Sequence, residues 1–334
     1  MIAVRSLGNR KVEVIEKPRP EPGKNDVLVR IKAAPICGSD LHGIYRSPNP
    51  HPHVPGHEIA GEVAEAGRSS RWKPGMRVCV PAVIGCGTCW MCVKGFTIYC
   101  EKPRILGFLE DGAHAEYVSV PESHPLLLPD YVSYEAGSLV TDPLGVPFHA
   151  YKNIGLTARD TIAVFGLGPM GLGAVIVAKF LGAEVIGVEI NEYRLNLAGK
   201  IGADHLVNPA GEDVKERIMK ITGGRGLDRA IECAGQDKTL GLALDLTRKL
   251  GKVAIVGENP KATISPSDHF NRKELTLVGG TCFNLGDYDE IMGIMRRGLN
   301  PERIITHRFP LKDAAEAYRL FDEGQTGKVV FVDR

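Results

Sequence analysis

The sequence predicts an α/β chain that combines a doubly wound parallel sheet with a second, mainly β domain. Its 334 residues are enough for about two domains, each with a core of its own. From about residue 160 onward, short apolar runs alternate with helix-length segments, which is the rhythm of βαβ units. The preceding part differs, because short β-branched runs there are separated by Pro- and Gly-rich breakers.

In the first region, strands are expected over residues 12–15 and 26–31, with a breaker rich in proline over residues 18–23 between them. The expected strands of the second region span residues 161–165, 184–188, 204–207, 228–232, 252–256 and 275–278, and the helices between them span residues 169–181, 192–201, 212–221 and 240–250. A helix over residues 311–323 and a strand over residues 328–332 complete the expected elements.

Composition excludes several classes of partner. The chain carries 41 Lys and Arg against 40 Asp and Glu, so no basic excess is present to bind nucleic acid or an anionic membrane. The first six residues lack the apolar stretch of a signal peptide, and residues 169–188 are too short and too polar to span a bilayer. We therefore expect a cytoplasmic, reducing location, where the eight cysteines are explained by metal binding or catalysis rather than by disulfides.

Four of those cysteines lie close together in a C-x2-C-x2-C-x7-C pattern. They are Cys86, Cys89, Cys92 and Cys100. Four thiolates can surround one ion tetrahedrally, and they suit Zn²⁺ or, as an alternative, an iron–sulfur cluster. A shell of four protein ligands leaves no position for a substrate, so this ion is expected to be structural.

A second group of metal-binding residue types lies earlier in the chain. Cys37, His57 and a carboxylate such as Glu58 would hold Zn²⁺ with one position left for a water or an alcohol oxygen. The nearby pair His51 and His53 is interpreted as part of a polar surface loop.

The segment Gly166-Leu167-Gly168-Pro169-Met170-Gly171 matches the G-x-G-x-x-G dinucleotide fingerprint. The pattern is weak alone, but an expected strand precedes it and an apolar helix follows, as pyrophosphate binding requires. Glu189 ends the next expected strand, where a carboxylate can bind a ribose diol and repel a 2′-phosphate. This favours NAD over NADP, and the cationic Arg194 is the one feature that argues the other way.

Together these motifs resemble the zinc-dependent medium-chain dehydrogenases over nearly the whole chain. The carrying motifs are Cys37-Gly38-Ser39-Asp40-x-His42, Gly56-His57-Glu58-x2-Gly61-x5-Gly67, the four cysteines, the fingerprint, and Ile-Thr-His-Arg-Phe-Pro at residues 305–310. Asp142 stands where simple alcohol dehydrogenases place a third zinc cysteine, so the chain most resembles the polyol and threonine dehydrogenase branch. The resemblance implies a GroES-like catalytic domain over residues 1–145, an NAD-binding Rossmann domain over 146–282, and a return to the catalytic domain over 283–334.

The resemblance also implies a role for each matching residue. Cys37 and His57 would bind the catalytic zinc, and Glu58 and Asp142 are both candidates for the third ligand, in exchange with water. Asp40 would orient His57, while Ser39 would take the alcohol proton and pass it through the ribose toward His42. The remaining implied contacts are with the cofactor: Glu189 and Arg194 at the adenosine end, and the backbone of residues 256–258 and 281–283 near the nicotinamide.

The function that these expectations support is hydride transfer between NAD(H) and a secondary alcohol or ketone of a polyol, sugar or hydroxyamino acid. Sorbitol-type members place an arginine shortly after the glycine that matches Gly280, whereas this chain reads Thr-Cys-Phe-Asn over residues 281–284. Two alternatives remain open: a cofactor-binding relative without catalysis, and a dehydrogenase of simple alcohols. The family commonly forms dimers or tetramers, so a homo-oligomer is expected.

Overall fold

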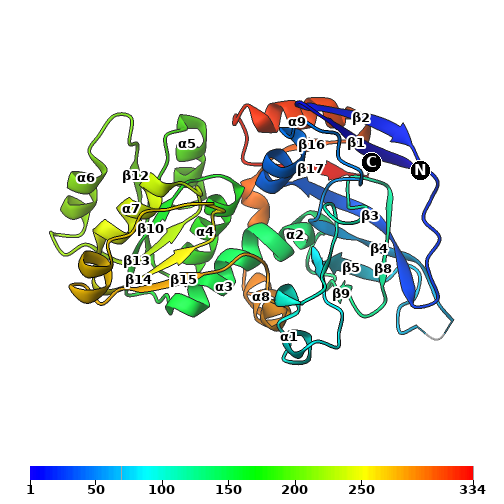
Figure 1. Cartoon of the computed structure of the whole chain (residues 1–334), viewed down its shortest axis with the longest axis horizontal. Helices are drawn as coiled ribbons and strands as arrows, with labels where there is room; N and C mark the ends of the chain where they lie inside the picture. Colours follow the sequence, from blue (N-terminus) through cyan, green and yellow to red (C-terminus); the bar gives the residue numbers. More distant parts are fainter. Residues whose placement is uncertain (69, 334) are drawn as a thin grey trace. The chain divides into compact units, whose positions relative to one another are not determined.

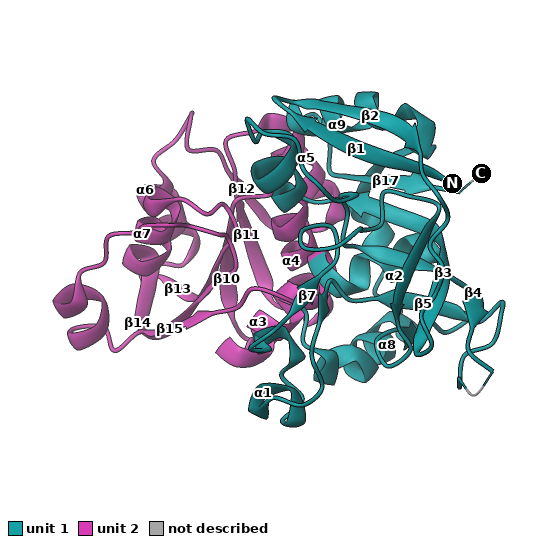
Figure 2. Cartoon of the chain, turned by 45° about the vertical axis from the view of Figure 1, so that its right-hand side comes forward, with its two compact units in different colours: residues 1–142, 283–334 teal, residues 143–282 magenta. Residues whose placement is uncertain are grey.

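The computed structural model describes residues 1–68 and 70–333 and divides the chain into two compact units (Figure 2). Unit 1 contains Met1–Asp142 and Phe283–Arg334, and unit 2 contains Pro143–Cys282. The first boundary therefore falls after residue 142, whereas the sequence prediction placed it after residue 145. The difference arises because residues 140–144 form a helical turn that runs directly into the first helix of unit 2.

Unit 2 is built on one parallel sheet of six strands, in the order β12-β11-β10-β13-β14-β15 (Figure 1). Its strands are β10 (Thr161–Phe165), β11 (Glu184–Val188), β12 (His205–Val207), β13 (Leu227–Glu232), β14 (Thr247–Ile255) and β15 (Thr276–Gly279). Its α-helices are α3 (Gly145–Ile154), α4 (Pro169–Phe180), α5 (Glu192–Ile201), α6 (Val214–Ile221) and α7 (Asp237–Leu246). The sheet and the alternation of strand and helix confirm the predicted fold class.

One predicted element of unit 2 is wrong in extent. The helix expected over residues 240–250 ends at Leu246, and Thr247 already begins β14. The chain then turns at Leu250, which has a left-handed φ of 61° and whose side chain is 62% exposed. Periodicity alone cannot separate the end of a helix from the start of a short strand.

Close backbone packing explains two glycines of unit 2. A Cβ on Gly171, in the first turn of α4, would lie 1.9 Å from the carbonyl oxygen of Gly166. A Cβ on Gly173 would lie 1.7 Å from the carbonyl oxygen of Pro143, at the entry to α3. Because real Cβ contacts are never so short, only glycine allows α4 to pack this closely at both points.

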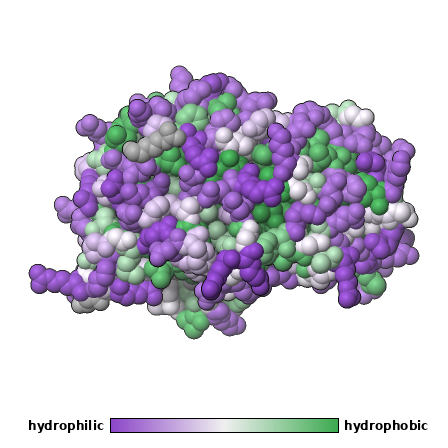
Figure 3. All heavy atoms as spheres, turned by 180° about the vertical axis from the view of Figure 1, so that it is seen from behind, coloured by the Kyte–Doolittle hydropathy of each residue, from purple (hydrophilic) through white to green (hydrophobic). Residues whose placement is uncertain are grey.

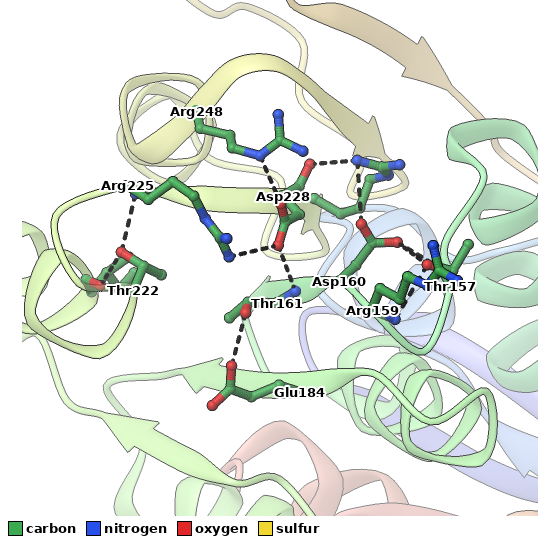
Figure 4. Close-up of polar contacts among 12 residues, drawn as sticks. Thr157, Arg159, Asp160, Thr161, Glu184, Thr222, Arg225, Asp228 and Arg248 are labelled. Carbon is green, nitrogen blue, oxygen red and sulfur yellow. Dashed lines mark hydrogen bonds and ion pairs between the residues drawn. The ribbon is translucent and has the colours of Figure 1, made fainter.

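The amino-terminal edge of this sheet is held by an ion-pair network around Asp228 (Figure 4). Its carboxylate accepts hydrogen bonds from the Thr161 amide at 2.9 Å, from Arg248 Nε at 2.6 Å and from Arg225 Nη2 at 3.3 Å. Burial alone would raise the pKa of Asp228, but the amide and the two guanidinium groups outweigh it and lower the pKa. The network joins the starts of β10 and β13 to β14.

Unit 1 contains a seven-stranded sheet in the order β16-β17-β3-β4-β5-β9, with β8 paired to β3. The strands of this sheet are β3 (Asp26–Ile36), β4 (Ile59–Ala66), β5 (Arg77–Val80), β8 (Tyr117–Pro121), β9 (Leu126–Leu127), β16 (Ile305–Phe309) and β17 (Lys328–Val332). Two small two-stranded antiparallel sheets pair β1 (Ile2–Gly8) with β2 (Lys11–Glu16) and β6 (Val83–Ile84) with β7 (Arg104–Ile105). The α-helices are α1 (Trp90–Val93), α2 (Tyr134–Leu139), α8 (Tyr288–Arg296) and α9 (Ala314–Asp322).

Strand β17 brings the C-terminal segment back to the first part of the chain. It pairs antiparallel with β3, and Val329 lies opposite Ile36, the residue before Cys37. The segment after residue 282 thus belongs to the same unit as the first 142 residues.

Polar and apolar residues are mixed over the face of the molecule shown in Figure 3. Among the residues that the structure describes, no helix is long and apolar enough to cross a membrane.

Candidate metal centres and active site

The four-cysteine cluster, formed by Cys86, Cys89, Cys92 and Cys100, lies on the loop between β6 and β7. Its sulfur atoms all lie within 4.8 Å of one another. A tetrahedral zinc site with bonds of about 2.3 Å holds its sulfurs about 3.8 Å apart, so only a modest inward movement is needed. The backbone also stabilises a thiolate at Cys100. The N–H groups of Cys86 and Lys102 donate to its Sγ at 3.2 and 3.3 Å.

The pKa of the Cys86 thiol is lowered, which favours metal binding by this residue. The Thr88 hydroxyl, and then the backbone N–H groups of residues 88 and 89, lower the pKa of Cys86 to about 6. A thiol with such a pKa is mostly thiolate at neutral pH, which is the form that binds a metal. The cluster therefore fits Zn²⁺ in its donor set. Burial raises the pKa of Cys92, so an ion bound there would displace the proton of that thiol.

The Cys37 cluster contains Cys37, His57, Glu58 and Asp142, whose nearest ligand atoms also lie within 4.8 Å of one another. Cys37 follows β3, His57 and Glu58 precede β4, and Asp142 lies on the helical turn Val140–Leu144 after α2. Cys37 Sγ lies 3.1 Å from Asp142 Oδ2. The structure thus gathers all four residues that the sequence analysis named as candidate ligands.

Asp40 holds the two ligand loops together. Its carboxylate accepts hydrogen bonds from the Cys37 amide at 2.8 Å and from the Gly56 amide at 3.3 Å, and Oδ1 lies 3.4 Å from His57 Nδ1. Nε2, the other nitrogen of the His57 ring, lies 3.5 Å from Ser39 Oγ. With Nδ1 facing the carboxylate, Nε2 is the nitrogen that can bind a metal, as is usual when a histidine ligand is oriented by an acid.

Lys328, at the start of β17, forms a fully buried ion pair with Glu58 Oε1. The other carboxylate oxygen, Glu58 Oε2, is buried and has no hydrogen-bond partner. A buried carboxyl oxygen without a hydrogen-bond partner calls for a cation or a donor. Together with a thiolate, an imidazole and a second carboxylate, it makes the donor set fit a catalytic Zn²⁺ with three protein ligands and one open position.

His42 lies apart from the ligand atoms. It is an exposed residue of the helical turn Asp40–Tyr45, which begins directly after Ser39. Its Nδ1 lies 3.4 Å from Arg46 Nη1, and Arg46 Nε donates to Asp322 of α9 at 2.6 Å. His42 therefore shares a turn with Ser39, and its role in proton transfer stays a prediction.

The fingerprint residues form the turn between β10 and α4. Gly166 has a φ of +86°, and a Cβ there would lie 2.7 Å from the side chain of Ala234. Gly168 is the N-cap of α4 and Pro169 occupies its first turn, so the first amide groups of the helix stand open for an anion. Leu167 is buried and Met170 half-buried on either side of this turn.

Glu189 is tied to the same turn. Its Oε2 accepts from the Leu167 amide at 2.8 Å, and its Oε1 accepts from the amides of Ile190 and Asn191 at 2.8 and 2.9 Å. Arg194 Nη1 lies 3.9 Å from the Cβ position of Gly168. The carboxylate and the guanidinium group that the sequence analysis assigned to the adenosine end thus both lie beside the fingerprint.

Comparison with known proteins identifies the family. Residues 23–130 match the alcohol dehydrogenase GroES-like domain, and residues 169–297 match the zinc-binding dehydrogenase domain. The chain is 37% identical to an L-threonine 3-dehydrogenase of Pyrococcus furiosus, over 96% of this chain and 94% of that one. It belongs to the zinc-binding alcohol dehydrogenases. This confirms the predicted family and enzyme class.

Solved structures of alcohol dehydrogenases are also similar in fold. An alcohol dehydrogenase of Thermus sp. ATN1 superposes with a TM-score of 0.93 at 33% identity, covering all of both chains. An alcohol dehydrogenase of Escherichia coli CFT073, solved in complex with NADH, gives a TM-score of 0.91 at 28% identity, covering 100% of this chain and 99% of that one.

Burial raises the pKa of the two cluster members Cys37 and Glu58, whereas the charged groups Asp40 and Lys328 beside them are stabilised in their ionised forms. Burial alone would raise the pKa of Asp40, but His57 and the Cys37 amide lower it to about 2. Burial alone would also lower the pKa of Lys328, yet Glu58, Cys37 and Asp142 together raise it. Asp40 and Lys328 therefore stay ionised at neutral pH.

Sequence reasoning missed Lys328. A lysine within the otherwise apolar strand Lys328–Val332 was the available signal, because lysine is almost never fully buried without a counter-charge. The roles of residues 256–258 and 281–283 near the nicotinamide stay predictions.

Proposed function

We propose that this dehydrogenase transfers a hydride between NAD(H) and the carbinol carbon of a secondary alcohol, in a polyol, sugar or hydroxyamino acid. The observation that carries the proposal is the presence, in one chain, of a mixed thiolate, imidazole and carboxylate cluster and of a dinucleotide fingerprint held by Glu189. A threonine dehydrogenase among the relatives supports a hydroxyamino acid as one substrate class.

The proposed reaction is balanced as alcohol plus NAD⁺ giving ketone, NADH and a proton. A zinc ion held by Cys37, His57 and a carboxylate supplies Lewis acidity, which lowers the pKa of the alcohol hydroxyl. Asp40 keeps His57 in the ligating orientation. Ser39 Oγ, 3.5 Å from His57 Nε2, accepts the hydroxyl proton and gives up its own through the ribose hydroxyl toward His42, on the helical turn that Ser39 caps.

Glu58 and Asp142 both offer a carboxylate oxygen to the third ligand position. Glu58 Oε1 is already engaged by Lys328, so this residue can ligate only through Oε2 without breaking the ion pair. Asp142 Oδ2 lies beside Cys37 Sγ. We propose that one of the two carboxylates fills the position and that the other, or water, replaces it during turnover.

The four-cysteine cluster is proposed to hold a second, structural zinc. Its closed set of four thiolates leaves no position for a substrate. The thiols of all eight cysteines are free of disulfides in the structure, which supports a reducing, cytoplasmic location. A homo-oligomer, dimer or tetramer, is also proposed, and light scattering of the purified protein measures it.

NAD is the proposed cofactor rather than NADP. Glu189 Oε2 accepts one amide hydrogen bond and keeps a lone pair for a ribose hydroxyl, whereas Oε1 already accepts two. The negative charge of Glu189 disfavours a 2′-phosphate. Arg194, beside Gly168, is close enough to contact phosphate groups.

The test is a panel of polyols, sugars and hydroxyamino acids assayed for NADH and NADPH formation, with two zinc ions per chain verified first. We expect turnover with NAD and at least one secondary alcohol. Cys37→Ala is the matched control, and it should retain the fold without turnover. Absence of NADH formation across the panel, with zinc and NAD bound, would overturn the proposal.

A further inference from the structure

An aromatic side chain that the motifs do not include lies against the Cys37 cluster. The half-buried ring of Phe108 lies 5.3 Å, centroid to centroid, from the ring of His57, with an angle of 43° between the two planes. Its Cε1 atom lies 3.5 Å from the position that a Cβ on Gly43 would take, so the ring also covers the turn that follows Ser39. Phe108 thus contacts both the ligand His57 and the turn of the proposed proton path.

The loop that carries Phe108 is fixed to the ligand loop by its backbone. The Gly112 amide donates to Val54 O at 2.7 Å, and the Ala113 amide donates to Gly56 O at 2.8 Å. A Cβ on Gly112 would lie 2.0 Å from Gly56 O, and a Cβ on Gly107 would lie 2.6 Å from the same atom. Only glycine at both positions permits this approach, so the ring is held in place by the backbone on each side of it.

The loop is also braced internally. The Gly107 amide donates to Glu110 O at 2.9 Å, the Leu109 amide donates to Ile105 O at 2.8 Å, and Arg104 forms an ion pair with Glu110. Leu109, the neighbour of Phe108, points outward and is 56% exposed. Of these two adjacent apolar side chains, the loop therefore directs only Phe108 onto the metal ligand.

We propose that Phe108 is a specificity-determining residue, which selects secondary alcohols with a methyl or alkyl group on the carbinol carbon over those with a hydroxymethyl group. This inference rests on the proposed function. An alcohol whose oxygen lies beside Ser39 and the Cys37 cluster has its carbon substituents near the covering ring. The face of a phenyl ring offers no hydrogen-bond acceptor or donor, so a hydroxyl placed there loses its water without compensation.

The size of the effect follows from the chemistry of an apolar wall. A hydrophobic site rejects an otherwise similar substrate with one added hydroxyl by about 10²-fold in kcat/KM. The same wall should favour a methyl group, because its burial is favourable. The structure thus narrows the proposed substrate class to alkyl carbinols, such as hydroxyamino acids or diols that end in a methyl group.

The experiment uses two matched pairs, each differing by one hydroxyl: 1,2-propanediol with glycerol, and L-threonine with 4-hydroxy-L-threonine. We expect the methyl member to have the higher kcat/KM by about 10²-fold in the parent enzyme. Phe108→Ser should reduce that ratio at least about tenfold, and Phe108→Leu, which keeps an apolar wall, should retain it. Leu109→Ser is the control from the same loop and should leave the ratio unchanged.

A second measurement separates specificity from a structural defect. The dissociation constants of both members are measured calorimetrically on zinc-loaded enzyme saturated with NADH, which cannot oxidise an alcohol. The ratio of these constants should change in Phe108→Ser in the same direction as the kinetic ratio, with two zinc ions still bound. A parent ratio near one, or an equal loss for both members in Phe108→Ser, would overturn the role of Phe108 alone. Failure of the parent to oxidise any alcohol of the wider panel would overturn the proposed function as well.

Discussion

The four-cysteine cluster and the Cys37 cluster place their ligands in contrasting ways. The first takes all its ligands from one loop between β6 and β7, over residues 86–100, and Cys86 is exposed. The second takes ligands from residues 37, 57, 58 and 142, and its carboxylate Glu58 is fully buried beside Lys328. The four-cysteine cluster forms within one short segment of the chain, whereas the Cys37 cluster forms only when distant segments of unit 1 have packed.

This difference fits a structural role for the four-cysteine cluster and a catalytic role for the Cys37 cluster. A local cluster of four thiolates can hold its loop in shape and leave the rest of the unit unaffected. In the buried cluster Glu58 Oε2 has no hydrogen-bond partner, and a metal held there would act in a dry environment, where electrostatic effects are strongest. The same metal ion would therefore be structural in one place and catalytic in the other.

The strongest test of this comparison removes one cysteine ligand from each cluster and compares the two variants. Cys37→Ala should lower kcat/KM by at least about 10³-fold, because Lewis acidity contributes several kcal/mol to the transition state. Cys100→Ala should instead loosen the loop over residues 86–100, which limited proteolysis detects, and lower kcat/KM by less than about tenfold. Equal effects of both variants on turnover would contradict the division into a structural and a catalytic site.

Chelation tests the same division by kinetics. A bidentate chelator such as 1,10-phenanthroline should remove the ion of the Cys37 cluster first, because a position open to substrate is also open to a chelator. Activity should disappear with the first of two zinc ions, while the far-ultraviolet circular dichroism spectrum is retained. The second ion should leave only after a mercurial reagent has modified the thiolates. Loss of activity that follows release of the second ion would contradict this order.

Lys328→Met should destabilise unit 1 by about 3–5 kcal/mol, measured by urea unfolding, because it leaves Glu58 buried without its counter-charge. The double variant Lys328→Met/Glu58→Gln should recover part of that loss, since it removes both charges. Lys328→Met as stable as the parent would show that the buried pair adds nothing to the Cys37 cluster. The ligands of the four-cysteine cluster are supported instead by backbone amides and by the Thr88 hydroxyl.

A structural defect in unit 2, which contains neither cluster, serves as a reference for these results. Asp228→Asn should lower the stability by about 1.5–3 kcal/mol at pH 7, without a change in kcat/KM, because charged hydrogen bonds to Arg248 and Arg225 are lost. The pKa of Asp228 is lowered in the folded state, so its contribution is present above the unfolded carboxyl pKa and is lost as the pH falls through the folded one. Urea unfolding at pH 7 and pH 3 should therefore show the parent and the variant converging at the lower pH.

Features that depend on neighbouring residues could be predicted from the sequence. The four cysteines and the fingerprint are each contained in a single turn or loop, and the helix over residues 192–201 has the bounds that the structure gives it. Pairing of residues distant in the chain left no such signal. Asp142 was named only through the resemblance, and the contacts of Lys328 with Glu58 and of Phe108 with His57 depend on how strands and loops pack.

The pairing of β17 with β3 has a consequence for biosynthesis. Glu58 and Lys328 are 270 positions apart, and unit 2 lies between them in the chain. At a translation rate of about 5–20 residues per second, Glu58 leaves the ribosome roughly 15–50 s before the lysine that neutralises it. Unit 2 is contiguous and can fold in that interval, whereas the sheet of unit 1 must wait with an unpaired edge at β3. The catalytic half of the molecule is thus the part most exposed to chaperones and to aggregation while the chain is being made.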